Sequence, residues 1–252
     1  ENEEDFTTDR LVAMDILHQP ERVIIEYNGM WLVSNFEKMQ LPTGWGVEQQ
    51  ITCVDGSTFQ MYMANMKSIF MDMIRNSDMV IFNRCKEDDP LPTYRRGIKV
   101  ANQRAEVIFE DEEGELGDIF QDEMPFDMNA PVIEILPEDY GIWFVDAMDH
   151  PENYEGKTVK FKARVMKPRG MGSKFFVPGR TAMTCCADDT TFLGYVCKSA
   201  YAPKLTPGEW VEVTAKVGIE KRNEYQGEEG IVLDAEHVEQ CDPLEDEMVY
   251  FN

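Results

Sequence analysis

The stretch KTVKFKARV at residues 157–165 decides the fold of the second half of this chain. Polar and apolar residues alternate along it, which is typical of a β-strand with one face in a core. A second alternating stretch, WVEVTAKV, follows at residues 210–217. Gly, Pro and Asp turns separate further predicted strands over residues 174–177, 190–197 and 230–238. Five or six strands within about 100 residues predict a small OB-like β-barrel.

Upstream of these strands, the chain changes its pattern. Residues 129–135 read as a strand and linker, and residues 138–148 have the apolar spacing of a helix that ends before Pro151. We therefore place the barrel domain at residues 128–252 and a separate domain at residues 1–127.

Residues 11–110 alternate short apolar runs with longer helical patterns, which indicates a parallel sheet with crossover helices. Strands are predicted over residues 22–26, 50–54, 79–83 and 106–109. Ser57 is predicted to cap the helix that follows the second strand. Its apolar face comprises Phe59, Met63, Met66, Phe70 and Met73, and we interpret these methionines as core packing. The predicted fold class is α/β followed by β.

The chain is strongly acidic, with 48 Asp and Glu against 24 Lys and Arg and a formal net charge of -24. This charge disfavours nucleic acid and anionic lipid and favours cationic partners or metal ions. No apolar run approaches the roughly 18 residues of a membrane-spanning helix, so we expect no membrane insertion. The acidic start carries no secretory signal, and six cysteines without one indicate reduced thiols. The predicted location is the cytoplasm.

In open α/β sheets, ligands bind beyond the carboxyl ends of the strands. The residues at these predicted ends are 26–29, Asp55 and 83–88.

Three segments in this half resemble the CobW-type GTPase family: RVIIEYNGM (22–30), QITCVDG (50–56) and SDMVIFNRC (77–85). With RRGIKVANQRAE (95–106), the resemblance covers about residues 10–115. It implies a partial P-loop-NTPase-like sheet with flanking helices. It places Glu26 near a magnesium site, with Gly29 after it, and gives Asn83 the role of orienting a guanine base. Lys86 replaces the family's aspartate, which leaves Asp88 as the nearby carboxylate.

No Gly-x-x-x-x-Gly-Lys-Ser/Thr phosphate loop occurs in this sequence. Such a loop wraps backbone N–H groups and a lysine around the phosphates. We therefore expect no GTP hydrolysis from this chain as given, and GTP with Mg²⁺ only if a longer chain supplies that loop.

The barrel half contains a pair of adjacent thiols, in RTAMTCCADD at residues 180–189. Thiolates suit zinc or copper(I), and carboxylates can complete a zinc shell, so the candidate ligands are Cys185, Cys186, Asp188 and Asp189. A further ligand could come from Cys197, His237, His150 or a partner chain. The alternative is that strand alternation buries one sulfur in the core and exposes the other. Thiol redox chemistry would need a low-pKa thiolate near a cation such as Arg180.

The segments YEGKTVKF (154–161), GRTAMTCCADD (179–189) and GYVC (194–197) look like the soluble C-terminal domain of the YcgQ-like family. The resemblance covers about residues 130–252. It implies association with a permease-like membrane protein and a role in metal or small-solute transport.

These patterns lead to one hypothesis and one alternative. The hypothesis is an accessory protein of metal homeostasis or transport, with zinc as the expected metal, related to GTP-dependent metallochaperones and binding metal around Cys185 and Cys186. The alternative is a non-catalytic module that docks on a permease-like membrane partner. Serine-hydrolase and zinc-protease motifs are absent from the sequence.

Overall fold

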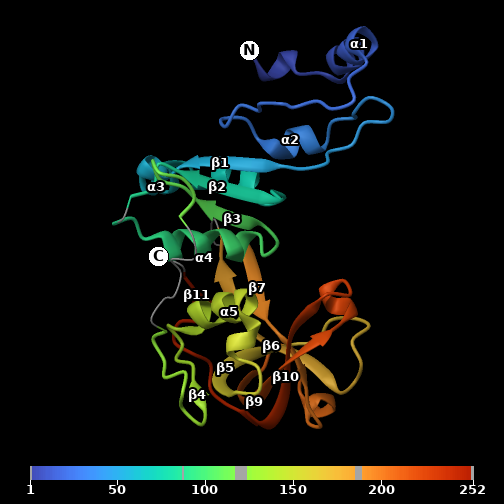
Figure 1. Ribbon diagram of the computed structural model, residues 1–252. Helices are drawn as coiled ribbons and strands as arrows, with labels where there is room; N and C mark the ends of the chain where they lie inside the picture. The colour runs from blue at the N-terminus through green and yellow to red at the C-terminus, as the bar shows by residue number, and fades with distance from the viewer. Residues whose placement is uncertain (1, 87, 117–123, 185–188, 251–252) are drawn as a thin grey trace. The chain divides into compact units, whose positions relative to one another are not determined.

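The computed structural model of the chain describes residues 2–86, 88–116, 124–184 and 189–250. It divides into two compact units (Figure 1). Unit 1 comprises Glu1–Leu91 and Ala101–Ile119, and unit 2 comprises Pro92–Val100 and Phe120–Asn252. Within the part of the chain that is described, no helix is both long and apolar enough to cross a membrane.

A three-stranded parallel sheet forms the centre of unit 1, in the order β1-β2-β3. The strands are β1 (Ile51–Asp55), β2 (Met79–Asn83) and β3 (Glu106–Phe109), which confirms three of the four predicted strands. Because successive side chains of a strand point to opposite faces of the sheet, one face buries the side chains of Val54, Val80, Phe82 and Phe109.

Helix α3 (Phe59–Ile74) follows β1 and packs with the ring of Phe59 at 4.9 Å from that of Phe82. Its non-helical residue Met66, at φ -135° and ψ 29°, marks a kink. The predicted cap at Ser57 is wrong, because Ser57 lies inside the 3₁₀ turn η2 (Gly56–Thr58) and Asp55 accepts the hydrogen bond from its N–H. Of the predicted apolar face, Phe59 and Phe70 are buried and the methionines are partly buried.

The predicted strand over residues 22–26 is wrong. Residues 22–28 have no regular structure, and the side chains of Val23 and Ile24 are 41% and 91% exposed. Instead, aromatic contacts organise this segment, with the ring of Tyr27 at 5.8 Å from Phe6 and 5.5 Å from Trp31. The helical elements around it are η1 (Glu3–Asp5), α1 (Thr8–His18) and α2 (Val33–Glu37).

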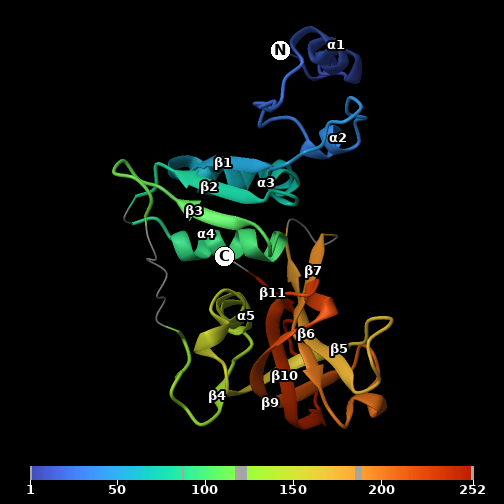
Figure 2. The same ribbon diagram turned by 45° about the vertical axis from the view of Figure 1, so that its right-hand side comes forward.

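Unit 2 contains the predicted closed β-barrel of five strands, seen from two sides in Figures 1 and 2. The strands are β5 (Thr158–Met166), β6 (Phe175–Met183), β8 (Val196–Lys198), β9 (Trp210–Lys221) and β10 (Glu229–Gln240). They pair as β5-β6-β8-β10-β9, and β9 returns to β5, which closes the barrel. The predicted strand over 190–197 splits into β7 (Thr190–Gly194) and β8, so β7 forms a hairpin with β6.

Short elements complete the barrel unit. Strand β4 (Ile133–Glu134) pairs with β5, and β11 (Met248–Val249) pairs with β6. The 3₁₀ turns are η3 (Pro151–Asn153), η4 (Ala202–Lys204) and η5 (Asn223–Tyr225). The β6–β7 hairpin depends on glycine, because a Cβ at Gly179 would lie 2.3 Å from the carbonyl oxygen of Leu193.

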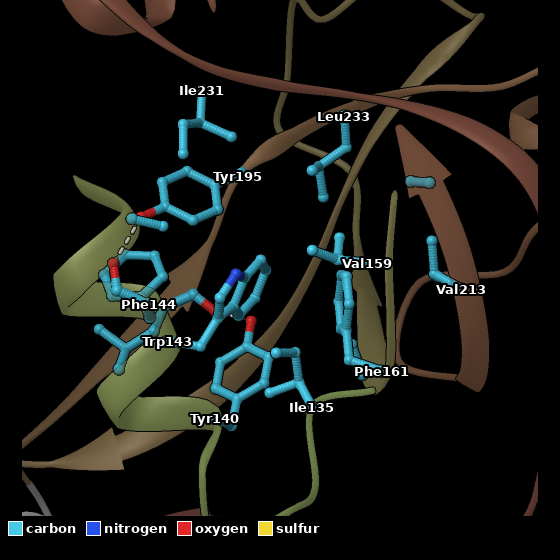
Figure 3. Close-up of a cluster of buried hydrophobic side chains, with 14 of the residues drawn as sticks. Ile135, Tyr140, Trp143, Phe144, Val159, Phe161, Tyr195, Val213, Ile231 and Leu233 are labelled. Atoms are coloured by element: carbon cyan, nitrogen blue, oxygen red, sulfur yellow. Dashed lines mark hydrogen bonds between the residues drawn. The ribbon is translucent and has the colours of Figure 1, made fainter. Parts of the chain in front are cut away.

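Helix α5 (Tyr140–Asp149), which confirms the predicted helix, contributes Tyr140, Trp143 and Phe144 to the barrel core, where they lie beside Phe161 and Tyr195 (Figure 3). The hydroxyl of Tyr140 donates to the Leu193 carbonyl at 3.0 Å, and that of Tyr195 donates to the Phe144 carbonyl at 2.5 Å. Helix α4 (Leu91–Ala101) also belongs to unit 2, apart from its end residues. Its Arg95 and Lys99 lie 2.5 Å and 3.4 Å from the carboxylate of Asp149 on α5.

Candidate functional site

The carboxyl ends of β1 and β2 carry a small polar cluster. Arg84 follows β2 in the left-handed region at φ 55°, and its guanidinium lies 2.6 Å from the carboxylate of Asp55. The other oxygen of Asp55 accepts from the Ser57 hydroxyl at 2.6 Å. The Ser57 hydroxyl and Arg84 together lower the pKa of Asp55. The side-chain oxygen of Asn83 is buried and has no hydrogen-bond partner among the described residues.

The residues predicted to hold a nucleotide do not all lie at strand ends. Asn83 ends β2, and Asp88 lies exposed in the turn that follows. Glu26 is exposed in the segment without regular structure, and Gly29 lies in a turn whose carbonyl accepts from Tyr62 of α3 at 3.2 Å. Because the strand over 22–26 does not form, Glu26 does not stand at the carboxyl end of a sheet strand. The charged residues that do lie at the carboxyl ends of the strands are Asp55, which ends β1, and Arg84, which follows β2. These two side chains form an ion pair with one another.

The predicted metal ligands Cys185, Cys186 and Asp188 lie outside the described residues. The described ends of this connection are bonded together: Thr184 donates its N–H and its hydroxyl to the carbonyl of Asp189, at 3.0 Å and 2.8 Å. Cys197 lies in the barrel core with no exposed surface, where burial raises the pKa of its thiol far above the ordinary value. A deeply buried, protonated thiol is a poor metal ligand.

The two histidines considered as further ligands each face one carboxylate. His150 lies 3.7 Å from Glu152, and His237 lies 3.3 Å from Glu239. No group of three His, Cys, Asp or Glu side chains able to hold a metal ion occurs within the ranges that the structure describes.

Arg180 of β6 is 2% exposed and holds main-chain oxygens rather than a carboxylate. Its guanidinium donates to the carbonyls of Pro137 at 2.5 Å, Asp246 at 3.0 Å and Met248 at 3.1 Å. It also lies 5.6 Å from the centre of the Tyr140 ring. Desolvation lowers the pKa of Arg180, and its bonds fasten the C-terminal segment to the barrel. This guanidinium is engaged in the fold, which weakens the redox interpretation.

An open groove was missed by sequence reasoning. It lies between the β5–β6 connection and the β9–β10 hairpin, has a volume of about 540 Å³, and is lined by residues 168–171 and 221–224. We call it the loop groove. Its two sides are about 50 residues apart in the sequence, so the sequence does not show that they meet. The one signal it offers is the segment KPRGMGSK (167–174), which contains three basic residues and no acidic residue.

Strand β10 and the segment after it form an acidic surface. Asp234, Glu236, Glu239 and Asp242 are exposed, as are residues 245–247. After Arg222 the sequence contains ten Asp and Glu and no Lys or Arg. We call residues 234–247 the acidic surface.

Comparisons with known proteins bear mainly on the barrel unit. Residues 115–251 match the family model described as the DUF1980 C-terminal domain. No curated protein matches this chain.

Solved structures resemble it only weakly. The mitochondrial single-stranded DNA-binding protein Rim1 of S. cerevisiae is 10% identical, with 35% of this chain and 97% of that chain covered and a TM-score of 0.22. Aspartyl-tRNA synthetase of Entamoeba histolytica is 14% identical, with 47% and 27% covered and a TM-score of 0.26. A deletion mutant of the single-stranded DNA-binding protein of Thermus aquaticus is 16% identical, with 35% and 42% covered and a TM-score of 0.21. These similarities carry no argument about function.

Proposed function

This chain belongs to the DUF1980 C-terminal domain family, and from that premise we propose that it is a non-catalytic binding module whose barrel docks a cationic protein partner. The partner that the sequence resemblance suggests is a permease-like membrane protein. The observation that carries the proposal is the acidic surface along β10 and the segment that follows it.

Charge complementarity supports a membrane-protein partner. Loops on the cytoplasmic side of membrane proteins carry an excess of Lys and Arg. A strand with exposed Asp234, Glu236 and Glu239 offers such loops a surface of opposite charge. Complementary charges of this kind raise the rate of association and select the partner.

The rigidity of the acidic surface supports docking as well. Strand β10 pairs with β9 over most of its length and with β8 at Val232–Asp234. The segment beyond it is fastened by Arg180 through the carbonyls of Asp246 and Met248. A surface held in one conformation loses little entropy when a partner binds.

Binding of the full chain to its permease-like partner in detergent tests the proposal by biolayer interferometry at two salt concentrations. We expect saturable binding that weakens at least tenfold between 50 and 300 mM NaCl, roughly as expected for several exposed charge contacts. The triple variant Glu236→Gln, Glu239→Gln, Asp242→Asn should bind more weakly, whereas the matched control Glu4→Gln, Glu112→Gln, Glu113→Gln should bind like the wild type. Equal losses in both triple variants, or no binding at either salt concentration, would contradict the proposal.

Zinc binding is a second candidate function, favoured by the hydrogen bonds between Thr184 and Asp189 at the two ends of the connection that carries the thiols. These bonds bring the chain position of Asp189 next to the end of β6. The candidate ligand set is then Cys185, Cys186 and Asp188 or Asp189, completed by a partner chain or water. The burial of Cys197 argues against it as a member.

A competitive zinc titration of the reduced full chain distinguishes this second function. We expect tight binding in the wild type and in the control Cys241→Ser, and a loss of at least tenfold in Cys185→Ser and Cys186→Ser, since each removes a thiolate ligand. Equal affinities in all four proteins would exclude the site. A nucleotide role remains a proposal only for a longer chain that supplies a phosphate loop.

A further inference from the structure

The loop groove combines free positive charge with a rigid frame in a chain whose net charge is -24. Three cations and one carboxylate line it: Arg169 on the β5–β6 side, and Lys221, Arg222 and Glu224 on the hairpin side. Glu220, next to Lys221 in the sequence and 3.5 Å from Arg222, is a second carboxylate on the hairpin side, so the three cations exceed these two carboxylates by one charge.

The charges on the hairpin side are partly neutralised. Arg222 binds Glu224 through two contacts, from Nη2 at 3.0 Å and from Nε at 3.2 Å, and also lies 3.5 Å from Glu220. Within the described ranges, neither Arg169 nor Lys221 has an ion-pair partner. Arg169 and Lys221, on opposite sides, are therefore the groove cations without an ion pair, and Glu229 is the cross-strand neighbour of Lys221 on β10.

Both sides of the groove are held in place. Arg222 lies over the ring of Phe175 at 4.4 Å, and the hydroxyl of Tyr225 donates to the Ile231 carbonyl at 2.5 Å. On the other side, the ammonium of Lys167 donates to the carbonyls of Ala202 and Leu205, both at 2.6 Å. These bonds fix the base of the β5–β6 connection and leave Arg169 at the rim. A site whose walls are already ordered loses little entropy on binding.

The surroundings select for a small ligand. A long polyanion would meet the repulsion of a chain with net charge -24, whereas a small anion senses mainly charges within the screening length of about 8 Å. Among the residues that the structure describes, no aromatic side chain lines the groove, and Arg222 covers the ring of Phe175 nearby. Single-stranded nucleic acids rely on exposed aromatic rings for base stacking. The groove therefore suits a small anion better than an oligonucleotide.

We propose that the loop groove binds a small anion with at least two negative charges, carried on phosphate or carboxylate groups, between Arg169 and Lys221. Arg169 holds it through the planar guanidinium, which matches two oxygens of such a group, and Lys221 contributes a point charge. This site is separate from the acidic surface proposed to dock a protein.

Calorimetric titration of the full chain with inorganic pyrophosphate and with citrate, in 50 mM NaCl, tests the site. We expect saturable binding, reduced about tenfold in Arg169→Ala and in Lys221→Ala and abolished in the double variant, in keeping with the strength of charge-assisted hydrogen bonds. The control Lys216→Ala removes an exposed cation of the same strand outside the groove and should bind like the wild type.

A further variant gains affinity and cannot be explained by unfolding. Glu224→Gln removes the carboxylate that neutralises Arg222, so anion binding should tighten a few-fold. Equal affinities in the wild type and all the variants, or no heat of binding at millimolar anion, would overturn the proposal. A single-stranded oligonucleotide or an anionic lipid vesicle that binds more tightly than pyrophosphate, with the same dependence on Arg169 and Lys221, would also overturn it and assign the groove to that larger ligand.

Discussion

The guanidinium of Arg180 donates to three carbonyls, one at Pro137 and two in the C-terminal segment. Two of these carbonyls belong to the segment that ends in β11, which adds only two residues to the sheet. A strand of two residues forms few backbone hydrogen bonds with its neighbour, so this pairing contributes little to the stability of the segment. Arg180 therefore adds two hydrogen bonds to the pairing of β11 with β6 that holds the C-terminal segment.

The substitution Arg180→Met should destabilise the protein by about 3 kcal/mol, because it removes three charge-assisted bonds and leaves three part-buried carbonyls without their donor. Urea denaturation followed by circular dichroism measures the free energy of unfolding. Arg164→Met is the control, since the Arg164 side chain is 42% exposed, and it should cost less than about 1 kcal/mol. Equal decreases in the free energy of unfolding of the two variants would show that Arg180 stabilises the fold no more than an exposed arginine does.

Cysteine environments differ sharply within the described chain. Cys53 on β1 is exposed, whereas Cys197 in the barrel is buried. Burial raises the pKa of Cys197, so the folded state holds its proton where an unfolded thiol, with a pKa of about 8.5, would lose it. The buried Cys197 thiol therefore contributes to the free energy of unfolding below the pKa of the unfolded thiol. This contribution is lost as the pH rises above that value, because the unfolded chain then releases the proton.

Alkylation with iodoacetamide at pH 8, followed by mass spectrometry of the peptides, should label Cys53 at least about 100 times faster than Cys197, because the exposed thiolate is the reactive form. In 8 M urea the two should react at similar rates. Labelling of native Cys197 at the rate of Cys53 would contradict its burial and restore it as a candidate metal ligand.

At the scale of single elements, the spacing of apolar residues in the sequence predicted most of the strands and two of the helices. Strands β1, β2, β3, β5, β9 and β10 and helices α3 and α5 lie close to their predicted positions. The failure at residues 22–26 has a physical cause: a short apolar run does not become a strand without a neighbouring strand, and here Tyr27 packs with aromatic rings instead. Ser57 does not cap α3 because it lies inside the preceding 3₁₀ turn, where the Asp55 carboxylate accepts from its N–H and its hydroxyl.

Helix α4 is joined to α5 by a compact ion cluster. The Asp149 side chain is only 7% exposed, and it faces Arg95 and Lys99, which are 20% and 12% exposed. Breaking a buried ion pair costs more than the pair contributes, because the remaining charges lose their compensation.

We therefore expect Asp149→Asn to lower the free energy of unfolding by about 3 kcal/mol. Thermal denaturation of the full chain, beside the exposed control Glu152→Gln, measures the effect. If Asp149→Asn melts at the wild-type temperature, the cluster does not stabilise the helix pair.

For the whole molecule, the sequence predicted a parallel sheet and a barrel, and the structure contains both. The loop groove could not be predicted, because only the closed barrel brings residues 168–171 and 221–224 together. The thiol pair was visible in the sequence, but its ligand set depends on chain positions that alternation alone does not determine.

Two surfaces compete as docking sites at this scale. One is the acidic surface of unit 2. The other lies in unit 1, where ten of the 14 exposed large hydrophobic side chains among the described residues fall between Met14 and Met61. Exposed apolar side chains also mark protein interfaces where they are contiguous. A decision between them requires a map of the contact.

Hydrogen–deuterium exchange of the full chain, with and without the permease-like partner, supplies that map. Our account predicts that the partner slows exchange across β10 and residues 241–249 and leaves residues 8–61 unchanged. Slower exchange confined to residues 8–61, with β10 unaffected, would contradict the barrel as the docking unit and assign that role to unit 1.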